Sequence, residues 1–472
     1  MTGRRSRLTT VLLAATAGTL AVAGSACSSS SSGSGGGTQA AATAPAASSG
    51  TQGVKEVPPP GGYITNFVKY VNGKPGAADP SLPPVKIGWA SNDGGGTIDS
   101  YAPQATTAAE VTVDWINKYA GGIDGHPLEL DKCPILNAEE EGQACAEKFL
   151  ADPGISLISL GALSVGASTL ESVVGGRKPI VLGSSLNASD VSAKNLWSLY
   201  SAFAFGAYPY GTFAVSPTFH AKNVAIVYRD APGASSELNA ATVSAEAGGA
   251  KVKAVQVASD ATDLLGAYTA AGAATADITV ALVSSPAQCL ASANALHQLG
   301  VDPTKVMWRP SCDQPQIKSQ LPGGDYPQYY STEIQSGDNL IQDPTGQAFV
   351  AALAKFGSAA HSTDGWYSLI FGQVMTIAKF LNNIGYGKIT PQAVIDQIHA
   401  WHGPQLMGGT SIQCNEFTIA PGNCSTGAYL FRYLGNGKWI RVSQWTEPPS
   451  ALLTYLEKLP ANGAFPTSWP PS

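Results

Sequence analysis

Three short patterns in this sequence contain residue types that could carry chemistry, and each lacks a necessary part. Ser164 lies in a glycine-flanked run over residues 161–166 that is similar to a nucleophile elbow, but the spacing differs from Gly-x-Ser-x-Gly and no histidine is placed to activate the serine. Gly94-Gly95-Gly96 could approach a phosphate, yet no Gly-Lys-Ser or Gly-Lys-Thr follows. His399 and His402 share one face of a predicted helix, but no third metal ligand is evident. We therefore predict a protein that is not an enzyme and that holds neither a metal nor a cofactor.

The cysteines indicate disulfide bonds and not a metal site. Without Cys27, six remain, and an even number in an exported chain indicates disulfides. A zinc site would need clustered Cys-x-x-Cys pairs, and the sequence has none. Fifteen pairings are possible. Links between sequence neighbours are the simplest set, namely Cys133–Cys145, Cys289–Cys312 and Cys414–Cys424.

The first residues indicate export. Three arginines among the first seven residues precede an apolar run over residues 8–23, as in a secretory signal peptide. Cys27 resembles the lipidated cysteine of bacterial lipoproteins, although Gly24 stands where Leu or Val is usual. We predict a signal peptide over residues 1–26 and a lipid anchor on Cys27. Ordinary cleavage near Ala21-Val22-Ala23, with loss of Cys27, is the alternative.

The composition excludes a nucleic-acid partner. Only 13% of the residues are charged, and the formal net charge is −6. Removal of the predicted signal peptide leaves 24 basic and 33 acidic residues. An acidic chain without a basic stripe would repel phosphate backbones. The Ser-, Gly-, Ala- and Pro-rich stretch that follows Cys27 cannot bury a core, so we predict a tether there. After it, Tyr63, Phe67 and Tyr70 could dock on the body.

From residue 85 onward, short apolar runs alternate with helical patterns. Strands are expected over residues 85–89, 128–130, 155–160, 180–182, 224–228, 251–257, 278–283 and 306–308. Helices are expected over residues 105–119, 139–151, 235–247, 365–381 and 391–401, and residues 197–219 read as a buried helix with a connector. Gly435-Asn436-Gly437 predicts a hairpin between strands at 429–433 and 438–442. This alternation of strands and helices starts at residue 85 and again at residue 224, so it predicts two parallel sheets covered by helices.

Part of this pattern resembles a known family. Val85-Lys86-Ile87-Gly88, then Trp115-Ile116-Asn117, then the run Gly121-Gly122-Ile123-Asp124-Gly125-His126-Pro127-Leu128-Glu129-Leu130 resemble the opening of type I periplasmic binding proteins. The branch is that of the branched-chain amino acid and amide receptors of ABC importers, similar to the Leu/Ile/Val-binding proteins. The resemblance covers about residues 85–445 and implies an α/β fold of two Rossmann-like lobes joined by a three-crossover hinge, with the ligand between the lobes.

This resemblance gives a domain map. The expected segments are a signal peptide over 1–26, a lipidated tether over 27–82, lobe one over 83–208 and 335–427, lobe two over 209–334 and 428–460, and a tail over 461–472.

The ligand site is expected at the carboxyl ends of the parallel strands, where helix N-termini offer free N–H groups. The loops concerned span residues 91–101, 161–168 and 183–187 in lobe one, and 230–236, 284–285 and 311–313 in lobe two. The candidate ligand-binding residues are Tyr101, Ser164, Val165, Gly166, Ser185, Asn187, Asp230, Pro232, Ser284, Ser285, Ser311 and Asp313. Helix capping is the ordinary alternative role for the Ser, Asn and Asp residues among them.

Four positions depart from the pattern that the family uses for amino acids. Counted as contacts, they are Val165 in place of a serine, the pair Ser185 and Asn187 in place of Ala-x-Thr, Pro232 in place of a tyrosine, and Ser311 in place of an acid. An unpaired ammonium in a closed site would be costly, so a standard α-amino acid is not expected unless Asp230 or Asp313 substitutes. The loops are rich in hydroxyls and amides and poor in charge, which predicts a small, polar, neutral solute.

These inferences combine into one functional prediction. We expect an exported solute-binding lipoprotein on the outer face of the cytoplasmic membrane, attached by its lipid anchor only and acting as a monomer. It would deliver its solute to the membrane permease of an ABC importer. A ligand-binding sensor that signals to a membrane partner is the alternative, and a hydrolase is the less favoured one.

Overall fold

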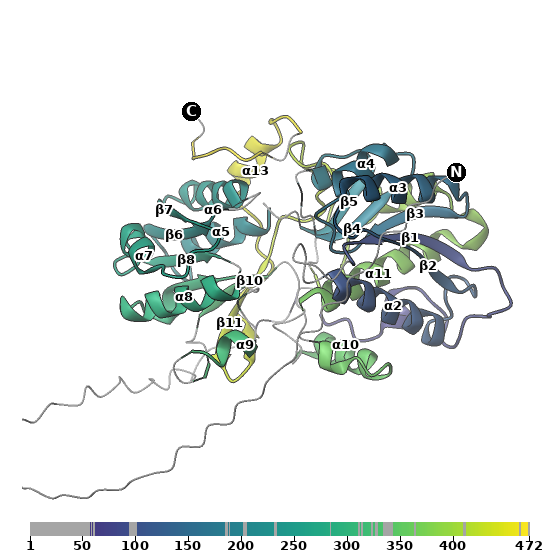
Figure 1. Cartoon of the computed structure of the whole chain (residues 1–472), viewed down its shortest axis with the longest axis horizontal. Coiled ribbons are helices and arrows are strands. Elements are labelled where there is room, and N and C mark those ends of the chain that lie inside the picture. Colours follow the sequence, from purple (N-terminus) through teal and green to yellow (C-terminus); the bar gives the residue numbers. More distant parts are fainter. Residues whose placement is uncertain are drawn as a thin grey trace, which may run out of the picture. The chain divides into compact units, whose positions relative to one another are not determined.

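The fold was analysed in a computed structural model of the whole chain (Figure 1). The structure describes residues 62–93, 102–184, 189–201, 205–230, 234–283, 285–309, 315–321, 329–333, 343–362, 365–408, 412–461 and 464–470, together with 57, 59, 187, 312, 324 and 325. The predicted lipid anchor at Cys27 lies outside these residues.

A five-stranded parallel sheet forms the centre of the first lobe. Its strand order is β2-β1-β3-β4-β5. The strands are β1 (Val85–Ser91), β2 (Leu128–Pro134), β3 (Ile155–Leu160), β4 (Ile180–Ser184) and β5 (Leu196–Ser201). β3 is buried along its whole length, as expected for a central strand covered on both faces. The carboxyl ends of all five strands meet at one edge.

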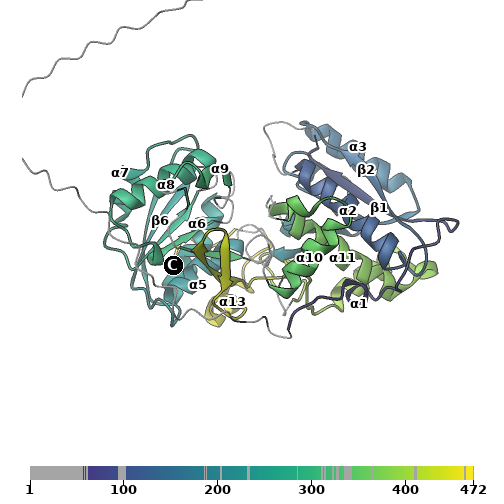
Figure 2. The same cartoon turned by 90° about the horizontal axis from the view of Figure 1, so that it is seen from below.

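Helices cover both faces of this sheet. They are α2 (Ala102–Tyr119), α3 (Glu139–Ala151), α4 (Ala167–Val174), α10 (Pro344–Ala354), α11 (Gly365–Ile384) and α12 (Pro391–His399). α11 packs against α2 and β4, and α3 packs against α4 (Figure 2). The Gln373 side chain on α11 donates to the Leu160 carbonyl of β3 at 2.9 Å, which fixes this late helix to the early sheet. The chain therefore returns to the first lobe, as predicted.

The second lobe is built on a seven-stranded sheet of order β12-β11-β10-β9-β8-β6-β7. The strands are β6 (Asn223–Arg229), β7 (Lys251–Val257), β8 (Ile278–Leu282), β9 (Val306–Trp308), β10 (Tyr330–Glu333), β11 (Tyr429–Gly435) and β12 (Lys438–Arg441). β6 to β10 pair in parallel, whereas β11 and β12 form the predicted antiparallel hairpin at the edge. Asn436 in its turn has a φ of 53°, a conformation that Asn tolerates well.

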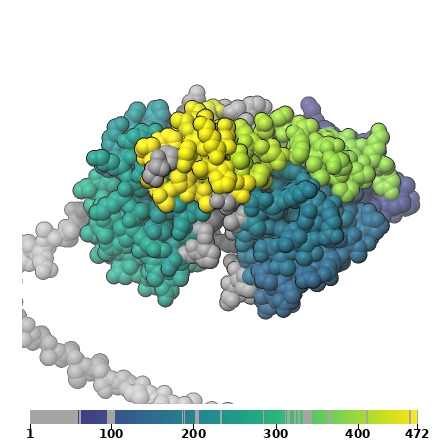
Figure 3. All heavy atoms as spheres, turned by 90° about the horizontal axis from the view of Figure 1, so that it is seen from above, coloured from purple at the N-terminus to yellow at the C-terminus, as the bar shows by residue number. Residues whose placement is uncertain are grey.

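The helices of the second lobe are α5 (Tyr208–Val215), α6 (Ala234–Ala247), α7 (Leu265–Ala271), α8 (Pro286–Gln298), α9 (Pro315–Lys318) and α13 (Ser450–Leu456). Leu452 and Leu456 of α13 are fully buried in the core that α5 and α6 share. In Figure 3 the yellow atoms of the C-terminal region cover one side of the teal atoms of this lobe.

The chain passes between the two sheets three times, after β5, between β10 and α10, and between α12 and β11. The third passage joins both cores, because Cys414 and Cys424 pack with the first lobe while Phe417 and Ile419 pack with the second. At the second passage, Asp343 caps α10 and forms a buried ion pair with Arg441 of β12, with 3.2 Å between Oδ2 and Nη2. The three-crossover connection between two parallel-sheet lobes is confirmed.

Residues 62–82, which the domain map assigned to the tether, are folded onto the first lobe. Phe67 and Tyr70 in the short helix α1 (Phe67–Tyr70) are buried. The Tyr70 hydroxyl hydrogen-bonds Thr376 of α11 at 2.9 Å and accepts the Leu406 N–H at 3.0 Å. These two aromatic rings supply apolar area that the preceding Ser- and Gly-rich stretch lacks, so the folded body begins earlier than residue 83.

One element was misjudged. Residues 197–219 were expected to be a buried helix with a connector, whereas the structure has strand β5 there, followed by a 3-10 helix (Phe205–Ala207) and α5. Both elements are buried, and they follow each other in one uncharged run. A short apolar run does not show by its periodicity whether it is a strand or a buried helix.

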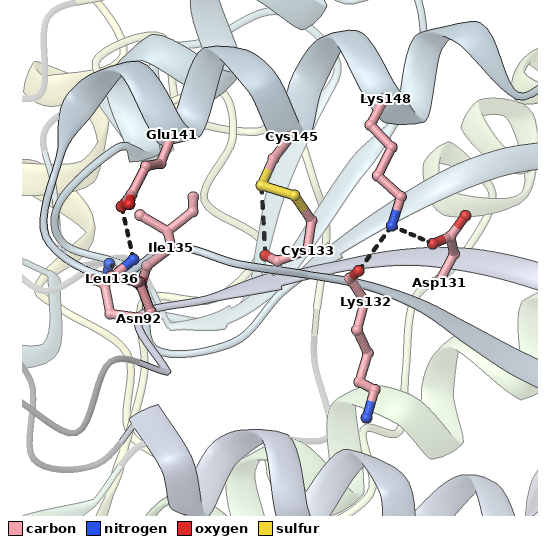
Figure 4. The surroundings of a disulfide bond; sticks show 9 residues. All are labelled: Asn92, Asp131, Lys132, Cys133, Ile135, Leu136, Glu141, Cys145 and Lys148. Carbon is pink, nitrogen blue, oxygen red and sulfur yellow. Dashed lines mark hydrogen bonds and ion pairs between the residues drawn. A yellow bond between two sulfur atoms is a disulfide. The ribbon is translucent and has the colours of Figure 1, made fainter.

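The three predicted disulfides, Cys133–Cys145, Cys289–Cys312 and Cys414–Cys424, are confirmed. The first joins the end of β2 to α3, beside an ion pair between Asp131 and Lys148 (Figure 4). The second ties the start of α8 to the segment after β9. The first two links therefore fasten a strand end or a connecting segment close to the edge where the ligand site is expected. The third lies within the third passage between the sheets.

Candidate functional site

Asn92 organises the carboxyl edge of the first sheet. It follows β1 directly and is 3% exposed. Its Oδ1 accepts the N–H groups of Ser164 at 2.7 Å and Val165 at 3.2 Å, and its Nδ2 donates to the Val165 carbonyl at 3.1 Å. One amide side chain thus fixes the loop after β3 from both of its polar ends.

The loop after β3 contains three predicted site residues that the structure brings together. Ser164 and Val165 are half-buried, and Gly166 has a φ of 81° at the start of α4. The Gly166 N–H donates to Glu139 Oε1 at 3.0 Å. The N–H groups of these three residues are therefore bound within the protein, and the Ser164 hydroxyl also donates to Asn92 Oδ1 at 3.3 Å. A solute could still meet the acceptor lone pairs of this hydroxyl and the Val165 side chain.

Asn187 joins the same loop from the end of β4. Its Nδ2 donates to the Leu163 carbonyl at 3.2 Å, and its N–H donates to Asp190 Oδ2 at 2.8 Å. Asn187 therefore lies beside Ser164, as the strand-end rule predicts. Tyr101 and Ser185 lie outside the described residues.

A buried acid pair supports the position of Asn187. Glu171 of α4 and Asp190 are 4% and 2% exposed. Burial raises the pKa of Glu171 to about 10, and the hydrogen bond and negative charge of Asp190 raise it further. The raised pKa favours the protonated form of Glu171 at neutral pH, next to the carboxylate that holds Asn187.

A second carboxylate, Asp93, lies beside Asn92. The Thr106 hydroxyl of α2 donates to Asp93 Oδ1 at 2.8 Å and accepts the Trp89 indole N–H at 2.9 Å. Burial raises the pKa of Asp93, and the hydrogen bonds from Thr106 and Ser91 oppose the rise. Residues 91–101 were predicted as a contact loop, but neither Asn92 nor Asp93 was singled out.

The corresponding edge of the second sheet carries arginines that the sequence analysis missed. Arg229 ends β6, and Arg309 follows β9 directly. The guanidinium of Arg309 pairs with the carboxylate of Glu237 in the first turn of α6. The Glu237 side chain is 1% exposed and that of Arg309 is 14% exposed, so this ion pair is largely removed from water.

The two guanidiniums are close enough to affect each other. Burial lowers the pKa of Arg309 to about 10, and the positive charge of Arg229 lowers it further. Burial also lowers the pKa of Arg229. The sequence signal for both was their position at the last residue of a strand or just beyond it. Their pairing with Glu237 is a long-range contact that no local pattern shows.

Of the six candidate residues in lobe two, the structure describes Asp230 and Ser285. Asp230 is exposed, and its Oδ1 accepts from Gln256 of β7 at 3.1 Å, which points it along the sheet edge. Ser285 is the N-cap of α8, where its hydroxyl accepts the Gln288 N–H at 3.2 Å. The ordinary capping role therefore applies to Ser285. The remaining four candidates, Pro232, Ser284, Ser311 and Asp313, lie outside the described residues.

The described residues contain neither a metal-binding cluster nor a helix that could span a membrane. Among the described residues, no group of three or more His, Cys, Asp or Glu could hold a metal ion. His399 instead packs its ring edge-to-face with Trp197, 5.5 Å between centroids. Within the same described ranges, no helix combines the length and apolarity needed to cross a membrane.

A family model described as periplasmic binding protein matches residues 84–433. A search of curated proteins finds no match. Solved structures share the fold. A fatty acid ABC transporter substrate-binding protein from Thermomonospora curvata has a TM-score of 0.61 and 14% identity, over 87% of this chain and 100% of that chain.

Two further structures extend the comparison. A solute-binding protein of an ABC transporter from R. palustris, in complex with 4-hydroxybenzoate, has a TM-score of 0.59 and 18% identity over 78% of this chain and 98% of that chain. A branched-chain amino acid transporter substrate-binding protein from Streptococcus pneumoniae, in complex with isoleucine, has a TM-score of 0.56 and 18% identity over 78% of this chain and 100% of that chain.

Identities this low establish the fold alone, and the family match carries the classification. That family consists of binding proteins and not of enzymes, as predicted. Because the matched residues extend through both lobes of the fold, the chain belongs to the periplasmic binding protein family.

Proposed function

We propose that this protein is the extracytoplasmic receptor of an ABC importer, which captures a small polar solute between its lobes and delivers it to the membrane permease. The observation that carries the proposal is the pair of parallel sheets whose strand ends gather polar side chains, joined by three passages of the chain. In open parallel sheets, this is the edge where ligands bind. Two lobes that close on such a hinge can enclose a small molecule.

The first lobe supports this proposal by its rigidity. Asn92 fixes the loop of Ser164 and Val165 before any solute arrives. A loop that is already ordered loses little entropy on binding, which favours affinity. In this proposal the Ser164 hydroxyl and the Asn187 amide orient the solute, and Val165 gives it an apolar contact.

The choice of solute class rests on the same residues and on the relatives. The solved relatives bind ligands as different as 4-hydroxybenzoate and isoleucine. Val165 replaces the serine that the amino acid receptors use, so we do not expect tight binding of leucine, isoleucine or valine. Binding to the folded form alone stabilises it by about 2.7 kcal/mol at a hundredfold excess over Kd.

The experiment is a thermal-shift screen of the purified protein against a broad library of small metabolites, followed by calorimetry of each hit. We expect at least one solute to raise the melting temperature by several degrees, with saturation and no turnover. A large shift with micromolar leucine would contradict the solute class. The absence of any saturating ligand in the library would contradict the receptor role.

Transport and sensing are separated by an uptake assay. Cells that lack the partner permease should fail to accumulate the labelled solute, although the receptor is still present and still binds it. A sensor would leave uptake unchanged and would alter gene expression instead.

The anchor is part of the proposal. Two acyl chains on Cys27 would hold the protein at the membrane, whereas one chain binds only marginally. Wild-type protein should sediment with membranes, and Cys27→Ala should release it. Equal membrane fractions for both forms would remove the lipid anchor from the proposal and leave the receptor role intact.

A further inference from the structure

The second lobe brings two guanidiniums to one sheet edge. Arg229 ends β6 and Arg309 follows β9, and only β8 separates these strands in the sheet. Because the three strands are parallel, both arginines lie at their carboxyl ends, where this fold places its ligand.

The surroundings of the pair favour a negative charge. Charged groups removed from water require compensation by opposite charge. Glu237 supplies one carboxylate, which is bound to Arg309 and buried in the first turn of α6. Both arginines have further contacts within the protein, but each guanidinium carries five N–H donors in a planar fork, so it can bind a ligand in addition to a protein partner.

The exposed acid next to this pair does not oppose the attraction. Asp230 follows Arg229 in the chain, yet its carboxylate is turned to Gln256 of the outer strand β7. Tyr210 of α5 donates its hydroxyl to the Trp308 carbonyl at 3.4 Å, next to Arg309, and adds a polar neighbour without a charge.

We propose that the solute is a small organic acid and that Arg229, which lies near the Arg309–Glu237 pair, binds its carboxylate on the second lobe. This inference rests on the proposed receptor function. A planar guanidinium matches a carboxylate with two parallel hydrogen bonds, which a neutral amide cannot reproduce. It differs from the expectation of a neutral solute, which was based on loops that begin after Arg229 and Arg309.

The test uses matched pairs of probes that differ only at the acid group. They are benzoate and benzamide, hexanoate and hexanamide, and succinate and succinamide. We expect at least one acid to raise the melting temperature while its amide does not. Arg229→Gln should weaken that acid by about 10- to 100-fold in Kd, the usual value of a hydrogen bond between charged groups.

Three variants sharpen the assignment. Lys253→Gln removes the same charge from an exposed position on β7 and should leave the Kd within about twofold, since exposed charges are screened. Arg229→Lys keeps the charge without the fork and should give an intermediate Kd. Arg309→Gln alone would strand the buried Glu237 carboxylate, so Arg309 is tested as Arg309→Gln/Glu237→Gln, with Glu237→Gln as its reference.

The outcomes are separable from those of the receptor role. If an amide binds as tightly as its acid, or if Arg229→Gln binds the acid as wild type does, the cluster is a structural ion network and the anion assignment fails. If no acid in the panel raises the melting temperature, the assignment also fails. In each case a neutral hit from the metabolite library would keep the receptor role.

Discussion

At the scale of single residues, the buried acid pair makes stability depend on pH. The folded protein keeps the Glu171 proton up to a pKa of about 10, whereas an unfolded chain releases it near the ordinary value of 4.5. Between these values the folded state binds more protons than the unfolded state, so its stability falls as pH rises. Glu171 therefore contributes most to the free energy of unfolding at low pH.

We predict that Glu171→Gln reduces this dependence. The wild type should lose stability between pH 5 and 9 with a slope of at most about 1.4 kcal/mol per pH unit from this group. The glutamine variant keeps a hydrogen-bond donor without the titrating proton and should show a flatter profile. Urea unfolding at three pH values measures both, with the exposed Glu140→Gln as control. Parallel profiles for wild type and Glu171→Gln would show that Glu171 does not titrate as described.

Asn92 offers a second test at this scale. Asn92→Ala removes the acceptor of two loop N–H groups, and each buried donor left unpaired costs about 1–3 kcal/mol. Asn92→Asp keeps the acceptor and loses the donor to the Val165 and Ile135 carbonyls, so it should be affected less. Urea unfolding should give that order, and the affinity for any solute found should fall in the same order. A stability of Asn92→Ala equal to wild type would show that the loop does not depend on this side chain.

The residue scale also shows what a sequence can reveal about the site. Ser164 and Asn187 were predicted as site residues because they follow strands, and that rule needs no contact information. Glu237 and Arg309 are 72 residues apart in the sequence. They meet only because α6 packs on the sheet that contains β9. Asn92 had the right position but no local pattern to distinguish its side chain from an ordinary cap.

At the scale of elements, the segment before β1 is bound to the first lobe by a few specific contacts. Tyr70 is the central one, since its buried hydroxyl meets both Thr376 and the Leu406 N–H. Burial raises the pKa of Tyr70 to about 12, so the hydroxyl stays neutral over the physiological range.

Tyr70→Phe should therefore weaken this attachment. The ring remains, but the buried Leu406 N–H loses its acceptor, at a cost of about 1–3 kcal/mol. Limited proteolysis should then cut near residues 62–82 faster than in wild type. Tyr386→Phe, which alters a hydroxyl on the half-buried segment after α11, serves as the matched control. Unchanged cleavage in Tyr70→Phe would show that packing alone holds the segment.

Most elements were predictable because their apolar residues recur with the period of a strand or a helix. Helix α3, with its acidic first turn, was placed to the residue. Strand β5 was not, because it is a short apolar run followed closely by a second buried element. The periodicity of such a run does not show whether it is a strand or a buried helix. The docked segment before β1 was underestimated because two aromatic residues in a Gly- and Pro-rich stretch give no period at all.

At the scale of the whole molecule, one buried ion pair joins the second sheet to a helix of the first lobe. Arg441 and Asp343 are each 1% exposed, and the Asp343 carboxylate also caps α10 by accepting the Gly346 N–H at 2.7 Å. Arg441 additionally stacks over the Tyr429 ring at 4.6 Å. The second passage of the chain is fixed at this point.

Asp343→Ala should destabilise the protein by about 3–5 kcal/mol, because it strands a buried guanidinium. Asp343→Ala/Arg441→Met should recover much of the loss. Glu110→Ala breaks the exposed pair with Lys132 and should cost less than about 1 kcal/mol. Urea unfolding compares the three. A double variant no more stable than Asp343→Ala would indicate that the helix cap, and not the stranded charge, dominates.

The disulfides have a consequence for how the chain reaches its folded state. Their partners are separated by 12, 23 and 10 residues, and no loop encloses another. Short loops close with a small entropic cost, and non-nested loops close independently of one another. Oxidation can thus proceed in the order in which the chain emerges from a narrow channel, without exchange between distant thiols. When the reduced protein refolds under mild oxidation, intermediates with one or two disulfides should accumulate. These intermediates should contain the native pairs and few non-native ones. Trapped intermediates rich in other pairings would mean that long-range folding precedes the covalent links.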